Sequence, residues 1–217
     1  MVDPTLKATL KKKYGDEQVY VVPFQSVKHI PDKFTSPFKL TADEIYGGGQ
    51  LFLRCDAEYN PAMIQLIPYI IVVNKAHDKV YVTKRIAGEE RLKDTLALGC
   101  GGHINACDYG HDIIMNAALR EMNEELNIRL AKDTALETVG TVRDFQSSTC
   151  EHLGIVMVAT AGSVSVKEKD NLKGIWMTFE ELKQNYSQFE SWAKHIIDYA
   201  FANGNTLEAL LGKKAKK

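Results

Sequence analysis

Three glutamates close together in the chain have the residue type and spacing of a divalent-cation site. Glu121, Glu124 and Glu125 are three and four positions apart, next to Arg120. On an α-helix this spacing places them on one face, within about 100° of one another. Carboxylate oxygens are the ligands that Mg²⁺ and Mn²⁺ take. The spacing predicts such a site, or else a solvated acidic face in which Arg120 is the in-helix partner.

Flanking residues favour the cation site over the solvated face. Gly101 and Gly102 precede the acidic segment in the run Gly-Cys-Gly-Gly-His, where glycine permits positive φ and close approach of the backbone to a ligand. Asn127 follows at the expected helix end, and asparagine is second to glycine in the left-handed conformation of a helix C-cap. A glycine-containing turn, a helix and a residue that ends the helix thus follow one another as one unit.

This unit resembles the Nudix box: Gly, five residues, Glu, seven residues, Arg-Glu, an aliphatic, any residue, Glu-Glu, any residue, Gly, an aliphatic. Its second half is matched by Arg120, Glu121, Met122, Glu124, Glu125 and Ile128. Asp112 stands at the first Glu position, Asn127 replaces the second Gly, and Ala106 falls at the first Gly position. If Gly102 is the true counterpart, it precedes Asp112 by ten residues instead of six, which is a four-residue insertion.

The resemblance covers about residues 66–182. The hairpin ending in Lys84-Arg85 and the segment 174–182 look like the family's strand before the loop and its closing strand and helix. The long N-terminal segment and the stretched loop are similar to those of the MutT-like phosphoesterase group.

The resemblance implies hydrolysis of a diphosphate linkage, usually in a nucleoside diphosphate derivative, with Mg²⁺ or Mn²⁺. By the resemblance, Glu121, Glu124 and Glu125 hold the cation, and Arg120 orients a catalytic carboxylate. The general base comes from the box or from a later loop in this family. Glu121 is one candidate for this base. Glu168, in the polar segment before the strand predicted at 174–178, is another. The later segment also offers Asp170, and Glu151 is a weaker candidate.

Residues around the box are expected to contact the substrate or to support its loop: Gly101, Gly102, His103, Asp112 and Arg85, with Arg91 as a further phosphate partner. The spacing of His103, Cys107 and His111 also fits a zinc site. Structural zinc sites more often use Cys-x-x-Cys pairs, and a glycine-rich loop does not hold residues four apart together, so contact of His103 with substrate is preferred.

The elements that position these residues form an α/β or α+β fold, with a mixed sheet between helices. Strands are predicted at 66–73, 79–86, 136–143, 153–161 and 174–178, and a central helix at 112–127 follows a loop at 99–110. The predicted buried stripe of that helix is Met115, Leu119, Met122 and Leu126. Capping boxes at 178–181 and 187–190 predict two closing helices.

Residues 1–60 are predicted to form an N-terminal extension packed on the main domain, 61–217. They are irregular, with short strands at 18–22 and 50–54 and a capping box formed by Thr41 and Glu44.

The composition is that of a globular protein, with 45% hydrophobic and 25% charged residues, which excludes a disordered chain, a collagen and a disulfide scaffold. The 27 basic and 28 acidic residues nearly cancel, so neither a nucleic acid polymer nor a membrane is an expected partner. No secretory signal is recognisable, so a cytoplasmic protein with reduced cysteines is expected. The expected partner is a small nucleoside diphosphate derivative, and a homodimer is left open.

Two other functions stay open at this point. One is a Nudix-fold regulator that holds a nucleotide without cleaving it, against which the three retained glutamates argue. The other is an isomerase of isopentenyl diphosphate on the same fold, in which Cys100 serves as the active-site thiol.

Overall fold

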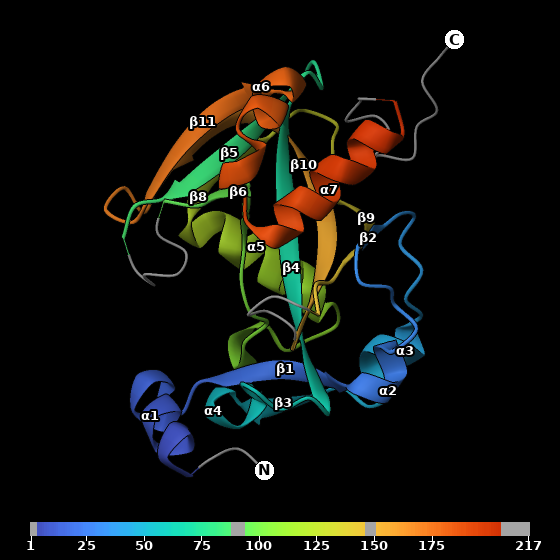
Figure 1. Cartoon of the computed structure of the whole chain (residues 1–217), viewed down its shortest axis with the longest axis vertical. Helices are drawn as coiled ribbons and strands as arrows, with labels where there is room; N and C mark the ends of the chain where they lie inside the picture. Colours follow the sequence, from blue (N-terminus) through green and yellow to red (C-terminus); the bar gives the residue numbers. More distant parts are fainter. Residues whose placement is uncertain (1–3, 88–93, 146–150, 205–217) are drawn as a thin grey trace.

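A computed structural model describes residues 4–87, 94–145 and 151–204 (Figure 1). Its strands are β1 Gln18–Pro23, β2 Phe34–Thr35, β3 Gln50–Leu53, β4 Met63–Asn74, β5 Lys79–Arg85, β6 Leu96–Leu98, β7 Cys100–Gly101, β8 Leu126–Leu130, β9 Glu137–Val142, β10 His152–Val166 and β11 Leu172–Thr178. Its helices are α1 Pro4–Tyr14, α2 Phe24–Val27, α3 Ala42–Tyr46, α4 Arg54–Ala57, α5 Ile113–Glu124, α6 Phe179–Gln184 and α7 Ser191–Ala202, with 3-10 turns η2 Ala106–Asp108 and η3 Tyr186–Gln188.

One mixed sheet forms the centre of the described chain, with the order β11-β5-β4-β10-β9-β2 along its main path. β4 and β10 run parallel from the pair Gln65 and His152 to the pair Asn74 and Ala161. Over this paired span both strands are almost wholly buried because helices cover both faces of the sheet. The predicted mixed sheet between helices is therefore confirmed.

Alternate residues of β4 point to the two faces and pack against different helices. Ile70 belongs to the core cluster that contains residues of α5, whereas Ile71 belongs to the cluster that contains residues of α7. Figure 1 shows α5 and α7 lying across the central strands.

Helix α5 begins as predicted but ends earlier. The Asp112 side chain caps it by accepting a 3.0 Å hydrogen bond from the Met115 backbone N–H. Its C-cap is Glu125, in a right-handed conformation, while Asn127 lies in β8 opposite Ser165. The prediction of a left-handed cap at Asn127 was wrong, because the alternating sequence after Glu125 pairs with β10 as a strand.

The buried face of α5 also differs from the prediction at one position. Leu119 is 43% exposed, and the face is formed by Ile113, Ile114, Ala117, Ala118, Glu121 and Met122. Two alanines let the helix lie close to the sheet, so the large side chain at 119 points away from it.

The predicted capping boxes at Thr41 and Thr178 are both confirmed. The box proposed at Ser187 was wrong. Ser187 lies in η3, and the N-cap of α7 is Glu190, whose carboxylate accepts hydrogen bonds from the backbone N–H groups of Trp192 and Ala193.

The segment before residue 61 contains more regular structure than its sequence suggests. β1 pairs with both β3 and β4, so it joins the main sheet. The lysine-rich helix α1, which was not predicted, packs against α4. Figure 1 shows these elements together at one end of the molecule.

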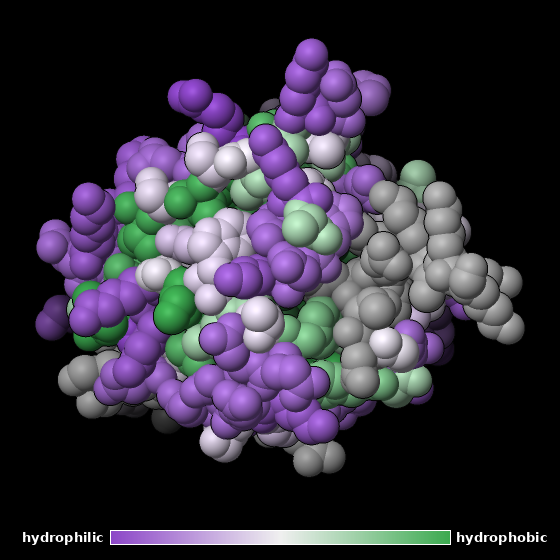
Figure 2. Space-filling view, turned by 90° about the horizontal axis from the view of Figure 1, so that it is seen from above, coloured by the Kyte–Doolittle hydropathy of each residue, from purple (hydrophilic) through white to green (hydrophobic). Residues whose placement is uncertain are grey.

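The surface seen from above the view of Figure 1 is mostly hydrophilic, with hydrophobic residues in separate patches (Figure 2). Among the described residues, the helices are too short or too polar to cross a bilayer.

Candidate active site

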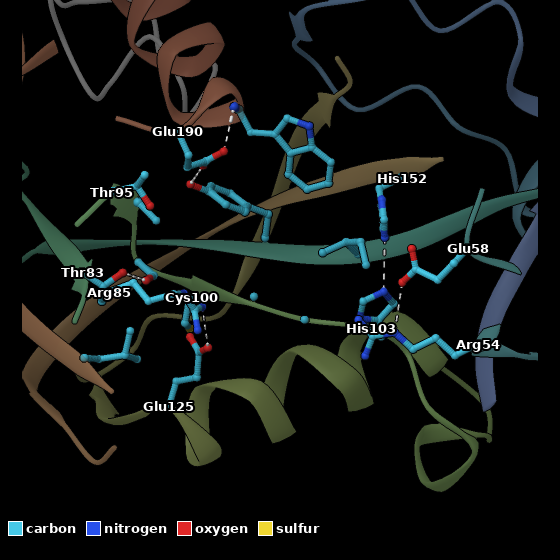
Figure 3. Close-up of a pocket in the computed structure, with 18 residues that line it drawn as sticks. Arg54, Glu58, Thr83, Arg85, Thr95, Cys100, His103, Glu125, His152 and Glu190 are labelled. Carbon is cyan, nitrogen blue, oxygen red and sulfur yellow. Dashed lines mark hydrogen bonds and ion pairs between the residues drawn. The ribbon is translucent and has the colours of Figure 1, made fainter. Parts of the chain in front are cut away.

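A cavity of about 340 Å³ lies between β4 to β7, the start of α7 and helix α4. Figure 3 shows two polar ends. Arg85 and Glu125 lie at one end, which we call the carboxylate end, together with Cys100. Glu58, His103 and His152 lie at the other, which we call the histidine end, together with Arg54. The rings of Tyr69 and Trp192, packed edge to face with centroids 5.8 Å apart, also line the cavity.

Arg120 joins the loop before α5 to the carboxylates of the helix. Its Nε and Nη2 donate to the two oxygens of Asp108 at 2.9 and 2.8 Å. Its Nη1 donates to Glu121 at 2.7 Å and to Glu124 at 2.9 Å, and its Nη2 also reaches the backbone carbonyl of His103 at 2.7 Å. The hydrogen bonds with Asp108 are the main cause that raises the pKa of Arg120.

The carboxylate that faces Arg120 from the loop is Asp108 and not Asp112. Asp108 is 3% exposed, whereas Asp112 is an exposed N-cap. Exactly five residues separate Gly102 from Asp108, which is the spacing of the first half of the box. The four extra residues therefore follow the acidic position, at 109–112. The spacing of Gly102 and Asp108 can be read from the sequence. It was missed because the alignment started from the second half of the box, which places Asp112 at the acidic position.

Gly102 allows the loop to lie directly on α5. A Cβ atom built on it would be 2.3 Å from Oε1 of Glu121, which is closer than side chains tolerate. The neighbouring Gly101 backbone amide hydrogen bonds to the carboxylate of Glu125. Both glycines thus lie beside the carboxylates, where they permit close packing of the loop on α5.

Glu125 is held largely out of water at the carboxylate end of the cavity. Burial raises its pKa to about 7, although the nearby Arg85 guanidinium opposes this shift. The Arg85 Nη2 lies 3.8 Å from Glu125 Oε1. Burial also raises the pKa of Glu121, against the opposing effect of Arg120. Both carboxyls are therefore easier to protonate than a glutamate in water.

The later candidates for the general base lie in different places. Glu168 is exposed in the turn between β10 and β11, and its charge contributes to the raised pKa of Glu125. The Lys167 backbone N–H, one residue before it, donates to the Glu125 carbonyl at 2.9 Å. Asp170 is exposed in the same turn, whereas Glu151 is buried beside His152. The structure brings Glu168 close to the box.

The carboxylates of the box suit a hard divalent cation in donor type and in charge, but in the described part of the chain no three of them bring their oxygens within 4.8 Å of one another, and of the three glutamates only Glu125 lines the cavity. Four carboxylates, those of Asp108, Glu121, Glu124 and Glu125, face the two guanidinium groups of Arg120 and Arg85. The negative excess can be balanced by an ion such as Mg²⁺ or Mn²⁺, which prefers carboxylate oxygen.

The histidine end was not predicted from the sequence. The Nε2 atoms of His103 and His152 are 3.3 Å apart. Together with Glu58 they form a group in which one ring nitrogen of each histidine and one carboxylate oxygen all lie within 4.8 Å of one another. Burial is the main cause that holds the pKa of His103 well below its usual range. Glu58 and His152 come from strands and turns far from the box in sequence, so no local spacing identifies them.

The alternative zinc group is not assembled. Cys107 and His111 are exposed, and His103 lies with Glu58 and His152 instead. Burial raises the pKa of the Cys100 thiol well above its usual value. The described cysteines Cys55, Cys100 and Cys107 are free, whereas Cys150 and Arg91 lie outside the described residues.

Comparisons with known proteins agree with this geometry. A family model described as the NUDIX domain matches residues 65–200. Protein YmaB of Bacillus subtilis (strain 168) is 36% identical over 157 residues, which are 67% of this chain and 75% of YmaB. The match to the family model includes the whole of α5 and most of the sheet that supports it.

Solved structures share the fold. Tm1382, assigned to the Nudix hydrolases, is 26% identical with a TM-score of 0.69, covering 84% of this chain and 97% of Tm1382. A bifunctional NMN adenylyltransferase/ADP ribose pyrophosphatase from Francisella tularensis, complexed with AMP and a Mn ion, is 19% identical with a TM-score of 0.51, covering 64% and 41% of the two chains. Since the family model spans more than half of the sequence, this chain belongs to the Nudix family.

Proposed function

We propose that this protein is a divalent-cation-dependent hydrolase that cleaves the diphosphate linkage of a nucleoside diphosphate derivative. The observation that carries the proposal is the position of Glu125 and Arg85 at one end of a cavity whose walls include Tyr69 and Trp192. A carboxylate and a guanidinium suit the cation and the phosphate, and aromatic walls suit a base or another flat group.

Glu121, Glu124 and Glu125 are the residues that would hold Mg²⁺ or Mn²⁺. When bound there, such an ion offsets phosphate charge and lowers the pKa of a water ligand. A bound cation would also offset the mutual repulsion of these carboxylates.

The remaining groups position the reactants. Arg120 fixes the Glu121 and Glu124 carboxylates through its Nη1 atom. Arg85 would pair with a phosphate oxygen of the substrate. Glu121 and Glu168 are the candidates to accept the proton of the attacking water, and Glu168, in an exposed turn near Glu125, can pass that proton on to solvent.

The test is hydrolysis of a panel of diphosphates with and without Mg²⁺ or Mn²⁺. The panel contains nucleoside diphosphate sugars, dinucleoside polyphosphates, NADH, ADP-ribose, modified nucleoside triphosphates and isopentenyl diphosphate. ADP-ribose is included because the Francisella protein is an ADP ribose pyrophosphatase. At least one member should be cleaved, with metal only.

Glu125→Gln should lower that rate by about two orders of magnitude, because it replaces a charged carboxylate ligand of the cation by a neutral amide. Glu137→Gln, which changes an exposed glutamate of β9, is the matched control and should leave the rate unchanged. Binding of nucleotides without turnover of any panel member would reject the hydrolase and favour the regulator. Isomerisation of isopentenyl diphosphate would favour the isomerase.

A further inference from the structure

We propose that Glu58, His103 and His152 form a second metal site, for a zinc-class ion, at the histidine end of the cavity. This site is separate from the carboxylate end and uses different donors. Its binding of a metal does not depend on the hydrolysis proposed above.

The two imidazoles have the spacing of metal ligands. Two nitrogens bound to a tetrahedral zinc at about 2.0–2.1 Å are about 3.3–3.4 Å apart. The Nε2 atoms of His103 and His152 are separated by 3.3 Å. A direct hydrogen bond between the rings has a similar length, so the third donor is needed to distinguish a metal site.

Glu58 supplies that third donor. One of its carboxylate oxygens lies within 4.8 Å of one nitrogen in each ring, and its Oε1 accepts a 3.2 Å hydrogen bond from Nε of Arg54. Arg54 is also paired with Glu17 at 3.0 Å. The ion pair with Arg54 holds the Glu58 carboxylate beside the two rings.

The three donors come from separate elements that hold them in place. His152 is the first residue of β10 and pairs with Gln65 of β4. The backbone carbonyl of His103 is fixed by Arg120 at 2.7 Å. Glu58 is the C-cap of α4. Because the fold already holds the three donors in place, less conformational entropy is lost when a metal binds to them.

The chemistry of the set favours zinc over magnesium. Two histidines and one glutamate are a ligand set of catalytic zinc sites, in which a fourth position stays open. Imidazole nitrogen suits Zn²⁺ and related transition ions, whereas the all-carboxylate group on α5 suits Mg²⁺ or Mn²⁺. All three donors line the cavity, so the open position is expected to face a bound molecule and to take one of its anionic oxygens.

The experiment is titration of the chelator-stripped full chain with Zn²⁺, followed by calorimetry, and with Co²⁺, followed by visible absorption. No diphosphate or Mg²⁺ is present, so failure of hydrolysis does not affect the result. The wild type should bind one Zn²⁺ per chain at this site, and Co²⁺ should give the intense absorption of a four-coordinate ion without a thiolate band.

Glu58→Gln and His152→Gln should each weaken Zn²⁺ binding by at least about tenfold. His111→Gln and Cys107→Ser alter exposed metal-binding residues outside the cluster, and Glu125→Gln alters the carboxylate end. These three variants should bind Zn²⁺ like the wild type.

Thermal unfolding of each variant, with and without Zn²⁺, separates loss of the site from loss of the fold. A ligand that binds the folded chain raises its melting temperature, so Zn²⁺ should stabilise the wild type and not Glu58→Gln. The proposal is overturned if the wild type takes up no stoichiometric Zn²⁺, or if folded Glu58→Gln binds it as tightly as the wild type.

Discussion

One guanidinium group, that of Arg120, holds three carboxylates and a backbone carbonyl in place. Asp108 is bound through two nitrogens, and its side chain is almost completely buried. Lysine keeps the charge of arginine but has a single ammonium nitrogen. It cannot replace the three guanidinium nitrogens that reach these different partners. Asp108 would therefore keep a buried charge with fewer hydrogen bonds.

Arg120→Lys should lower the free energy of unfolding by about 3 kcal/mol, in the range for a broken buried ion pair. Urea denaturation measures this value. Arg129→Lys, which alters an exposed arginine of β8, is the matched control and should change stability by less than about 0.5 kcal/mol. Equal stability of the two variants would show that the Arg120 contacts do not support the loop.

Glu125 should make stability fall as pH rises from about 5 to about 7. Its pKa is raised to about 7, mainly by burial, from a reference value of 4.5. Between those values the folded chain binds a proton that the unfolded chain has released, so rising pH favours unfolding. Urea denaturation in the presence of chelator should show a steeper decline for the wild type than for Glu125→Gln.

Identical declines for the two proteins would mean that Glu125 titrates normally. The difference between the two proteins is the required quantity, because burial also raises the pKa values of Glu121 and Glu190 and lowers that of His103. Glu190 and His103 are present in both proteins, so their contributions largely cancel, whereas part of any difference comes from Glu121, whose charge acts on Glu125.

Local spacing indicates which residues surround Arg120 on α5, but it gives no sign of the histidine end. Glu121, Glu124 and Arg120 lie within one helical turn, so their contacts follow from helical geometry. Asp108 was missed because two registers fit the box. His152 reaches His103 across 49 positions only through the pairing of β4 and β10, which no local pattern specifies.

At the scale of elements, the site depends on direct contact between the loop that follows β7 and helix α5. Gly102→Ala should disturb this contact, since the added Cβ would meet the Glu121 carboxylate. We expect a loss of about 1–3 kcal/mol in the free energy of unfolding. The rate of any metal-dependent hydrolysis should fall as well.

Gly110→Ala is the matched control for that variant. Gly110 lies in the four-residue insertion, and the nearest atom to its Cβ is the Asn116 side-chain nitrogen at 3.3 Å, which can move slightly. Denaturation and turnover should change little in this control. If Gly102→Ala is equally mild, the loop does not need its close approach to α5.

The boundaries of elements were predictable where one pattern dominated. The long apolar runs of β4 and β10 define central strands. The end of α5 was not predictable, because Leu126 fits both a helical stripe and the alternation of β8. The start of α7 was ambiguous because Ser187 and Glu190 both have capping side chains, and only tertiary packing places Glu190 beside Tyr69, at 2.7 Å.

At the scale of the whole molecule, residues 1–60 should unfold together with residues 61–217. β1 pairs with β4, and its Tyr20 and Val22 belong to the same core cluster as residues of α5. Differential scanning calorimetry should therefore give one transition, with equal calorimetric and van't Hoff enthalpies. Two separated transitions would show that the N-terminal extension folds independently.

The central claim is that the carboxylates of α5 bind a divalent cation at one end of the cavity. Anomalous diffraction from crystals of the full chain soaked in Mn²⁺ tests it most directly. The account predicts a peak in contact with the Glu121, Glu124 or Glu125 carboxylate oxygens, lost in Glu125→Gln. Fully occupied Mn²⁺ found only elsewhere, with those oxygens bare, would contradict it.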